Sequence, residues 1–330
     1  MEQSSKRALT FSLCSLLLLV IGLILAVRLG SVSIAFRDIF NSLFEYEETL
    51  EMMLVRQVRI PRALSVLMTG GILGVTGSMI QGVTRNPIAE PSILGVSQGA
   101  TLVISIFYAM GIGVTTANVM MASLIGAVIT GMIVLSFISK KANNRSMTKI
   151  LLAGTAMSTF FVSLTTVIGL LSNQSQMIGF WVSGGFRNAS WADFVLVFIV
   201  GMIGLGIAVL LSPKINLLNL GDDVAIGLGE NPNKIRAITL LVMIPMCAAA
   251  VAVGKNIAFV GLIVPQIVRK LLGEDYRKVI PCSFLLGAML LTYADIAARM
   301  MFDPYEMPIG IFTSLIGIPF FIAIARKERG

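Results

Sequence analysis

The sequence contains no histidine, and only 13% of its 330 residues are charged. The lack of histidine removes imidazole as a metal ligand and excludes serine or cysteine nucleophiles that a histidine base would activate. The three cysteines, Cys14, Cys247 and Cys282, lie in or beside apolar segments without the spacing of metal ligands, so we interpret them as small apolar residues. A phosphate-binding G-x-x-x-x-G-K-[ST] motif is also missing. We therefore expect that the chain is not an enzyme and that it binds no metal or cofactor itself.

Apolar residues dominate instead: 56% of the chain is hydrophobic and the mean hydropathy is +0.90. Apolar runs of about 18 residues or more recur, which is typical of membrane-spanning helices. The predicted fold class is all-α, a polytopic helical membrane protein with about ten transmembrane helices, and we treat residues 1–330 as a single transmembrane domain. The predicted spans are 8–27, 63–80, 92–110, 114–138, 149–171, 192–211, 237–253, 257–268, 279–301 and 309–325.

The basic residues predict the orientation. With an even number of spans, both termini lie on one side, and if that side is the cytoplasm, 17 of the 25 lysines and arginines fall in inner segments such as the basic loop at 140–145. Cytoplasmic loops are enriched in these residues, so both termini are predicted to be cytoplasmic. The same loops explain the net charge of +8 without a nucleic acid partner. Trp181 and Trp191 flank a predicted outer connection, and we interpret them as anchors at the membrane interface.

A polar segment at residues 213–236 interrupts the apolar runs. Its middle, Leu217 to Leu228, has apolar residues at helical spacing and is closed by Gly229 and Asn231-Pro232, which predicts one short amphipathic helix. Two interpretations are open on this pattern. The helix could be the contact through which a soluble partner moves a membrane channel, or the segment could be a cytoplasmic loop on the membrane surface.

Charged residues also mark the predicted outer ends of the spans. Arg59 and Arg62 flank Pro61, and Arg299 reaches the same side. These arginines could hold carboxylates of a partner with paired hydrogen bonds, or they could anchor helix ends. Asp295 lies one helical turn before Arg299 in an apolar run, where a lone carboxylate is costly. We predict a structural ion pair between the two, with a substrate or proton role for Asp295 as the alternative.

Pro87 and Pro91 interrupt the helical structure directly after the second predicted span, 63–80. Non-helical backbone at this depth is stable only where protein or a water-filled path covers it. We predict that the segment helps to form an inner gate, and simple turn formation is the alternative. The residues assigned to the gate and path are Gln81, Asn86, Pro87, Glu90, Pro91 and, in a later kinked span, Pro265.

Five motifs resemble one known family. They are RIPRALSVLMTGGILGVTGSMIQGVTRNPIAEPSILGVSQGA (59–100), LLNLGDDVAIGLG (217–229), VAVGKNIAFVGLIVPQIVR (251–269), LLGAMLLTYADIAAR (285–299) and EMPIGIFTSLIGIPFF (306–321). They are similar to the signature of the permease subunits of ABC importers for iron-siderophores, haem and cobalamin, a FecCD-like family. The likeness extends from about residue 30 over nearly the whole chain.

The resemblance implies a ten-span permease in the bacterial cell membrane that pairs with a second permease, identical or paralogous. It also implies two copies of a cytoplasmic ATPase, which bind ATP and Mg²⁺, and a substrate-binding protein on the outer face. In this family the segment matching 217–229 docks in a groove of the ATPase, and arginines matching Arg59, Arg62 and Arg299 meet acidic residues of the binding protein. The residues implied in ATPase coupling are Leu217, Leu218, Leu220, Gly221, Asp222, Asp223, Ala225, Leu228 and Gly229.

The predicted function is therefore a permease subunit that forms the translocation path for an iron-siderophore complex, driven by ATP hydrolysis on a separate subunit. Haem or cobalamin is the alternative substrate within the family. An ion-coupled secondary transporter is the alternative from another class, although Asp295 is the one candidate for a buried coupling charge and no repeated halves are visible. The resemblance also implies a smooth, poorly selective path that leaves recognition to the binding protein.

Overall fold

The computed structural model describes residues 2–30, 34–91, 95–112, 115–138, 147–176, 179, 181, 184–302 and 305–327. The predicted basic loop at 140–145 lies outside these ranges, as do residues 92–94 at the start of one predicted span. The described residues form helices and no β-strand, in agreement with the all-α prediction. The helices are α1 (Glu2–Arg28), α2 (Phe36–Phe44), α3 (Leu50–Leu54), the π-helical turn η1 (Val55–Arg59), α4 (Ile60–Thr84), α5 (Val96–Ala109), α6 (Thr116–Ile138), α7 (Met147–Leu171), α9 (Trp191–Leu220), α10 (Asp222–Gly227), α11 (Pro232–Gly254), α12 (Val260–Leu272), α13 (Tyr276–Met300) and α14 (Ile309–Lys327).

The predicted count of ten spans is not confirmed. A helix occupies each of the ten apolar runs, but seven helices of the described chain are long and apolar enough to cross a membrane. The apolar parts of α5 and α14, Val96–Ala109 and Ile309–Ile322, are shorter. Helix α12 has 13 residues, with Arg269 and Lys270 in its last turn. All three fall short of the roughly 20 apolar residues that a perpendicular helix needs to span the hydrocarbon core.

Helix α4 is the centre of the bundle. It is buried along almost its entire length and packs against α9, α11, α12 and α13. Glycines permit this packing: a Cβ atom on Gly74 would collide with the carbonyl oxygen of Ser283, and one on Gly77 with that of Gly261. Helices associate in a membrane mainly through van der Waals contact and interhelical hydrogen bonds, so small residues at the crossing points stabilise the bundle.

The substitution Gly77→Val should force α4 and α12 apart at their closest contact. The valine Cβ would lie 2.6 Å from the carbonyl carbon and the Cα of Gly261, which are backbone atoms that cannot rotate away. Overpacking of this kind costs about 1–3 kcal/mol, and we expect the thermal midpoint of the purified chain in detergent to fall by at least about 2 °C. Gly206→Val in α9 is the matched control, because a Cβ there meets nothing within 4 Å. Equal losses in the two variants would contradict the prediction.

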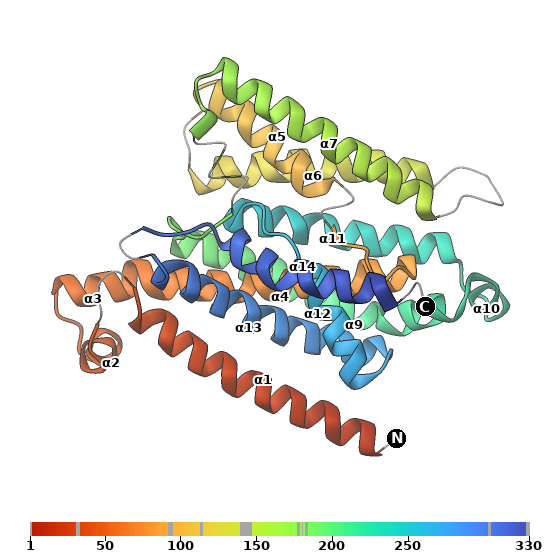
Figure 1. Ribbon diagram of the computed structural model, residues 1–330, viewed down its shortest axis with the longest axis horizontal. Helices are drawn as coiled ribbons and strands as arrows, with labels where there is room; N and C mark the ends of the chain where they lie inside the picture. Colours follow the sequence, from red (N-terminus) through yellow and green to blue (C-terminus); the bar gives the residue numbers. More distant parts are fainter. Residues whose placement is uncertain are drawn as a thin grey trace.

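The bundle has two distinct ends (Figure 1). Helices α5, α6 and α7 form a layer against α11, while α1 packs on α13 at the opposite side. Helices α2 and α3 lie at one end of the long axis, here named the α2 end. Helix α10 lies at the other, the α10 end, together with the first turn of α1 and the last turn of α14. The two termini therefore lie toward the same end of the bundle.

Candidate functional site

The polar segment at the α10 end does not form the single helix predicted for Leu217–Leu228. Helix α9 continues through Pro213 as far as Leu220, and Gly221 then breaks the chain with φ 131° and ψ 152°, a conformation that side chains rarely permit. Only Asp222–Gly227 forms the separate helix α10. Leu217, Leu218 and Leu220 thus belong to the last turn of α9. Apolar spacing could not reveal this break, because the two helices continue the same periodicity on either side of the glycine.

Apolar side chains are exposed on and around α10. Leu220, Ile226 and Leu228 expose 68%, 60% and 63% of their surface, while Leu218 and Ala225 are fully buried against the bundle. The helix therefore has one face packed on the bundle and another exposed to solvent. An exposed apolar patch at the tip of a polar segment is typical of a protein contact.

Asp222 joins three elements at this end. Its carboxylate is 2.8 Å from the guanidinium of Arg236 at the start of α11, and it also pairs with Arg85 just after α4. Arg236 in addition donates a hydrogen bond of 3.2 Å to the carbonyl oxygen of Val83. We name Arg85, Asp222 and Arg236 the charged junction. Asp223, in contrast, is exposed to solvent, so the two aspartates predicted together as partner contacts have different surroundings.

Gly229 and Glu230 complete the return from α10 to α11. Gly229 has φ 82°, and a Cβ atom added there would meet nothing within 4 Å, so the role of this glycine is conformational. Glu230 forms an ion pair of 3.1 Å with Lys214 of α9. The side chain of Asn231 accepts a hydrogen bond from the backbone of Lys234 and so caps α11. These local interactions hold α10 in a fixed position between its two long neighbours.

The chain forms no α-helix over residues 85–91, as the two prolines predict. Arg85 adopts a left-handed conformation with φ 51°, and Asn86 Oδ1 accepts a hydrogen bond of 3.0 Å from the backbone N–H of Ile88. The carboxylate of Glu90 accepts a bond of 2.6 Å from the N–H of Phe259, the residue that precedes α12. The segment leads along the chain from α4 toward α5, is half-buried apart from the exposed Arg85 and the buried Ala89 and Pro91, and is bonded to the residue before α12. Because of this bond we name it the α4–α12 connection.

Further contacts link α4 to α12 directly. The Gln81 amide donates to the carbonyl oxygens of Gly261 and Leu262, and its oxygen accepts a hydrogen bond of 2.7 Å from Arg269. The side chain of Gln266 donates to the carbonyl oxygen of Pro87. Pro91 packs against Gly261, and Pro265 is buried within α12. Of the residues predicted to form a gate, four contact α12 or the residue that precedes it, namely Gln81, Pro87, Glu90 and Pro91. Asn86 instead bonds within its own segment.

The arginines predicted to dock a binding protein lie buried near the α2 end. Arg62 is 2.9 Å from Asp295 and 2.9 Å from Glu306. Arg299 is 3.1 Å from the same Asp295, so the predicted ion pair is present, with Arg62 as an additional partner. Asp295 is only 1% exposed, and the two arginines are 7% exposed. A buried carboxylate is thus shared by two cations, which satisfies the requirement that intramembrane charges be paired.

Arg59 and Arg299 also complete the C-terminal end of α1. Arg59 donates to the carbonyl oxygens of Val27 and Arg28 at 2.9 and 2.7 Å. Arg299 donates to those of Ala26 and Leu29. The last carbonyl groups of a helix lack partners within the helix, so both arginines act here as caps for α1. This arrangement matches the alternative of helix-end anchoring more closely than that of free docking groups.

Sequence reasoning missed three charged contacts. Glu306 has no assigned role in the sequence prediction, although it is an acidic residue directly before the last apolar run. The pairing of Arg236 with Asp222 is also missed, because their spacing crosses a helix break. Arg85 is one of the 17 basic residues counted in the predicted inner segments and is given no partner, yet a single basic residue beside two prolines is a signal of an acidic partner.

Comparisons with known proteins cover nearly the whole chain. The FecCD transport family matches residues 18–327, a range that includes the charged junction, the α4–α12 connection and the buried arginines. The chain belongs to the FecCD transport family. This FecCD protein is therefore a transport permease, which confirms the resemblance seen in the sequence motifs, and its apolar helices make it a multi-pass membrane protein.

Two relatives of this FecCD protein come from Bacillus subtilis (strain 168). The iron(3+)-hydroxamate import system permease protein FhuB is 38% identical over 318 residues, which are 96% of this chain and 83% of the relative. The Fe(3+)-citrate import system permease protein YfmD is 37% identical over 328 residues, 99% of this chain and 97% of the relative. A solved structure described as an inward-facing metal-chelate type ABC transporter has a TM-score of 0.85 at 28% identity and covers 96% of this chain and 99% of that chain.

Proposed function

We propose that this FecCD permease forms the membrane path of a binding-protein-dependent ABC importer that moves an iron-siderophore complex into the cell. The observation that carries this proposal is the full-length similarity to permeases named for the import of iron(3+)-hydroxamate and Fe(3+)-citrate. Haem is the second candidate, because a hemin transport permease of Yersinia pestis is 32% identical over 320 residues. The import-system permeases that resemble this chain do not favour an ion-coupled secondary transporter.

The proposed complex contains a second permease, two ATPase subunits at the α10 end and a binding protein at the α2 end. Both termini and α10 then lie in the cytoplasm, in agreement with the excess of basic residues in the predicted inner segments. ATP and Mg²⁺ bind to the ATPase, and the permease itself is not catalytic. The exposed Leu220, Ile226 and Leu228 supply the apolar contact for the ATPase.

Movement of α10 would reach the path through contacts already described. Asp222 connects α10 to Arg85, and the α4–α12 connection that follows Arg85 is bonded to the start of α12. A rigid displacement of α10 therefore acts on the ends of α4, α11 and α12 together. We propose that this is how the predicted gate responds to nucleotide binding, with Gln81 and Glu90 holding α4 and α12 in register.

The binding protein would dock over the buried arginines. Arg59, Arg62 and Arg299 hold the end of α1 and the start of α4 in place. A carboxylate of the binding protein would have to compete with Asp295 and Glu306 for Arg62. We therefore propose that these arginines chiefly shape the docking surface, and that they pair with the partner only if the outer ends of the helices separate.

Uptake of radiolabelled iron in a strain that lacks this chain tests the function. Restoring the chain should restore ATP-dependent uptake of at least one ferric hydroxamate or ferric citrate complex, provided that the partner ATPase is present. A strain that carries the chain but lacks the ATPase is the control. Uptake without the ATPase would indicate a secondary transporter. Restoration of haem or cobalamin uptake alone would identify that compound as the substrate in place of an iron-siderophore complex.

A further inference from the structure

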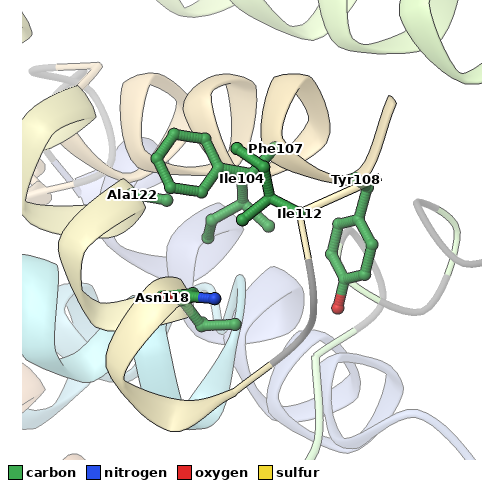
Figure 2. A pocket seen from close by; sticks show the side chains of 7 residues that line it. Ile104, Phe107, Tyr108, Ile112, Asn118 and Ala122 are labelled. Atoms are coloured by element: carbon green, nitrogen blue, oxygen red, sulfur yellow. The ribbon is translucent and has the colours of Figure 1, made fainter. Parts of the chain in front are cut away.

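A cavity of about 560 Å³ lies between the layer of α5 and α6 and the ends of α11 and α4. Its walls include Tyr108, Trp181, Phe186, Arg62 and Lys255, so it lies toward the α2 end. A much smaller recess of about 10 Å³ lies between α5 and α6, and it shares Tyr108 and Val119 with the cavity (Figure 2). The recess has room for about one water molecule, whereas the larger cavity has the size of a site for a small organic ligand.

The charges that line the cavity do not balance. Arg62, Arg187 and Lys255 face two carboxylates, Asp193 and Glu306. Glu306 lies 2.9 Å from Arg62 and 3.6 Å from Arg187, and these arginines hold its pKa below the usual value even though burial acts in the opposite direction. The cavity therefore has one more cation than anions among the described residues.

The remaining carboxylate also has a structural role. Asp193 accepts hydrogen bonds of 2.9 and 2.7 Å from the backbone N–H and the hydroxyl of Ser190, in a capping box at the start of α9. Asp193 is thus occupied in stabilising a helix end. Neither carboxylate of the cavity forms an ion pair with Lys255.

Lys255 is the cation left without a carboxylate among the described residues. Its ammonium group donates a hydrogen bond of 3.0 Å to the carbonyl oxygen of Gly185 and lies 5.9 Å from the centre of the Trp181 ring. Burial, together with Arg62 and Arg187, lowers the pKa of Lys255 below its ordinary value. A desolvated cation next to other cations is stabilised by any anion that enters the cavity.

The backbone of Lys255 is held in a conformation that favours glycine. Its φ is 62° and its ψ is −148°, and it directly follows Gly254 at the end of α11. A residue with a side chain is strained in such a conformation, and the surrounding structure has to maintain it. Hydrogen bonds on both sides do so, from Gly185 N–H to the Gly254 carbonyl and from Asn256 N–H to the Trp181 carbonyl. The protein thus holds a lysine, with its ammonium group at the cavity wall, at a position where glycine would cause less backbone strain.

Aromatic side chains form another part of the wall of the same cavity. Trp181 is 6% exposed and donates a hydrogen bond of 3.2 Å to the hydroxyl of Tyr108, and the two ring centres are 6.3 Å apart. Trp181 is therefore a packed wall residue, and the prediction that it anchors the membrane interface is wrong. Figure 2 shows the Tyr108 hydroxyl directed away from the small recess. A rigid aromatic wall next to an unpaired cation fits an organic anion with a sizeable body.

We propose that this cavity is a binding site for the cargo and that it selects negatively charged iron chelates, with Lys255 paired to an anionic oxygen of the chelate and Trp181 and Tyr108 against its body. This inference rests on the proposed function and makes it more specific. A ferric complex of three hydroxamates is neutral unless the chelator carries other charges, whereas citrate supplies additional carboxylates. The site thus distinguishes chelates by charge, in contrast to the smooth, poorly selective path that the sequence resemblance implies.

Equilibrium binding of two radiolabelled chelates to the purified importer in nanodiscs tests the proposal. The probes are ferric citrate and a neutral ferric trihydroxamate. Loss of a charge-assisted bond should weaken ferric citrate binding about tenfold to a hundredfold in Lys255→Met, while neutral trihydroxamate binding changes by less than about twofold. Lys255→Arg should retain most of the affinity. Lys270→Met, an exposed residue of α12 outside the cavity, is the matched control and should bind both chelates like the wild type.

Lys255→Gly separates charge from folding. Glycine accepts the positive φ, so this variant should have a thermal midpoint at or above that of the wild type and still lose ferric citrate binding. Wild-type affinity for ferric citrate in Lys255→Met or Lys255→Gly would overturn the proposal, as would equal losses for both chelates. Weaker docking of the binding protein with unchanged chelate binding would overturn it as well. A different result would contradict the proposed function itself, namely that the wild-type importer takes up no iron chelate in an ATP-dependent manner.

Discussion

Replacing Asp295 with asparagine should lower the stability of the permease by about 3–5 kcal/mol, the cost of removing one partner of a buried charge group. Asp295 lies between Arg62 and Arg299, at 2.9 and 3.1 Å, and is 1% exposed. Without its charge, two nearly buried guanidinium groups would face each other with Glu306 as the remaining acidic partner near Arg62. We expect less protein in the membrane and a clearly lower thermal midpoint in detergent.

Glu306→Gln is the matched control for this prediction. Glu306 also pairs with Arg62 at 2.9 Å, but 30% of its side chain is exposed, so water can replace part of the lost interaction. Its loss should therefore cost much less than that of Asp295. A double replacement of Asp295 and Arg62 by leucine should recover part of the loss, since no unpaired cation then remains at position 62. Equal stability of the Asp295 and Glu306 variants would contradict the burial argument.

Asp222→Asn should separate ATP hydrolysis from transport. The substitution removes the charge that holds Arg85 and Arg236 to the start of α10, while the exposed apolar face of α10 stays intact. We expect the ATPase to remain bound and active, and the amount of iron imported per ATP to fall about two- to thirtyfold, the range for residues that modulate coupling between sites. The measurements are iron uptake and ATP hydrolysis by the importer in proteoliposomes.

Asp223→Asn is the natural control for Asp222, because the neighbouring carboxylate is exposed and lies outside the charged junction. It should leave the ratio of iron to ATP near the wild-type value. Exchanging the charges, with Asp222→Arg and Arg236→Asp together, should restore part of the coupling, although Arg85 then meets a cation. The stability of Asp222→Asn should change little, since Asp222 is 37% exposed and exposed ion pairs contribute modestly. A stable variant with unaltered coupling would exclude the charged junction from the force path.

The sequence was a good guide wherever one physical property decided the outcome. Apolar length located the helices, prolines at 87 and 91 located the break after α4, and the pairing of Asp295 with Arg299 followed from the cost of a lone buried carboxylate. Prediction failed where local periodicity was ambiguous. The leucines on both sides of Gly221 follow one helical pattern, yet the φ of that glycine divides them between α9 and α10.

By itself, the sequence determined that this chain is an all-helical membrane protein of the FecCD type, because apolar runs and gapless motifs are properties of neighbouring residues. Only the tertiary structure decided which charges far apart in the sequence meet. Arg62 and Asp295 are 233 positions apart, and Lys255 faces a cavity whose walls come from widely separated parts of the chain. Helix packing sets such long-range pairings. The close approach of α4 to α12 and α13 at small residues fixes the relative positions of the helices, and so decides which side chains come into contact. No local pattern contains that information.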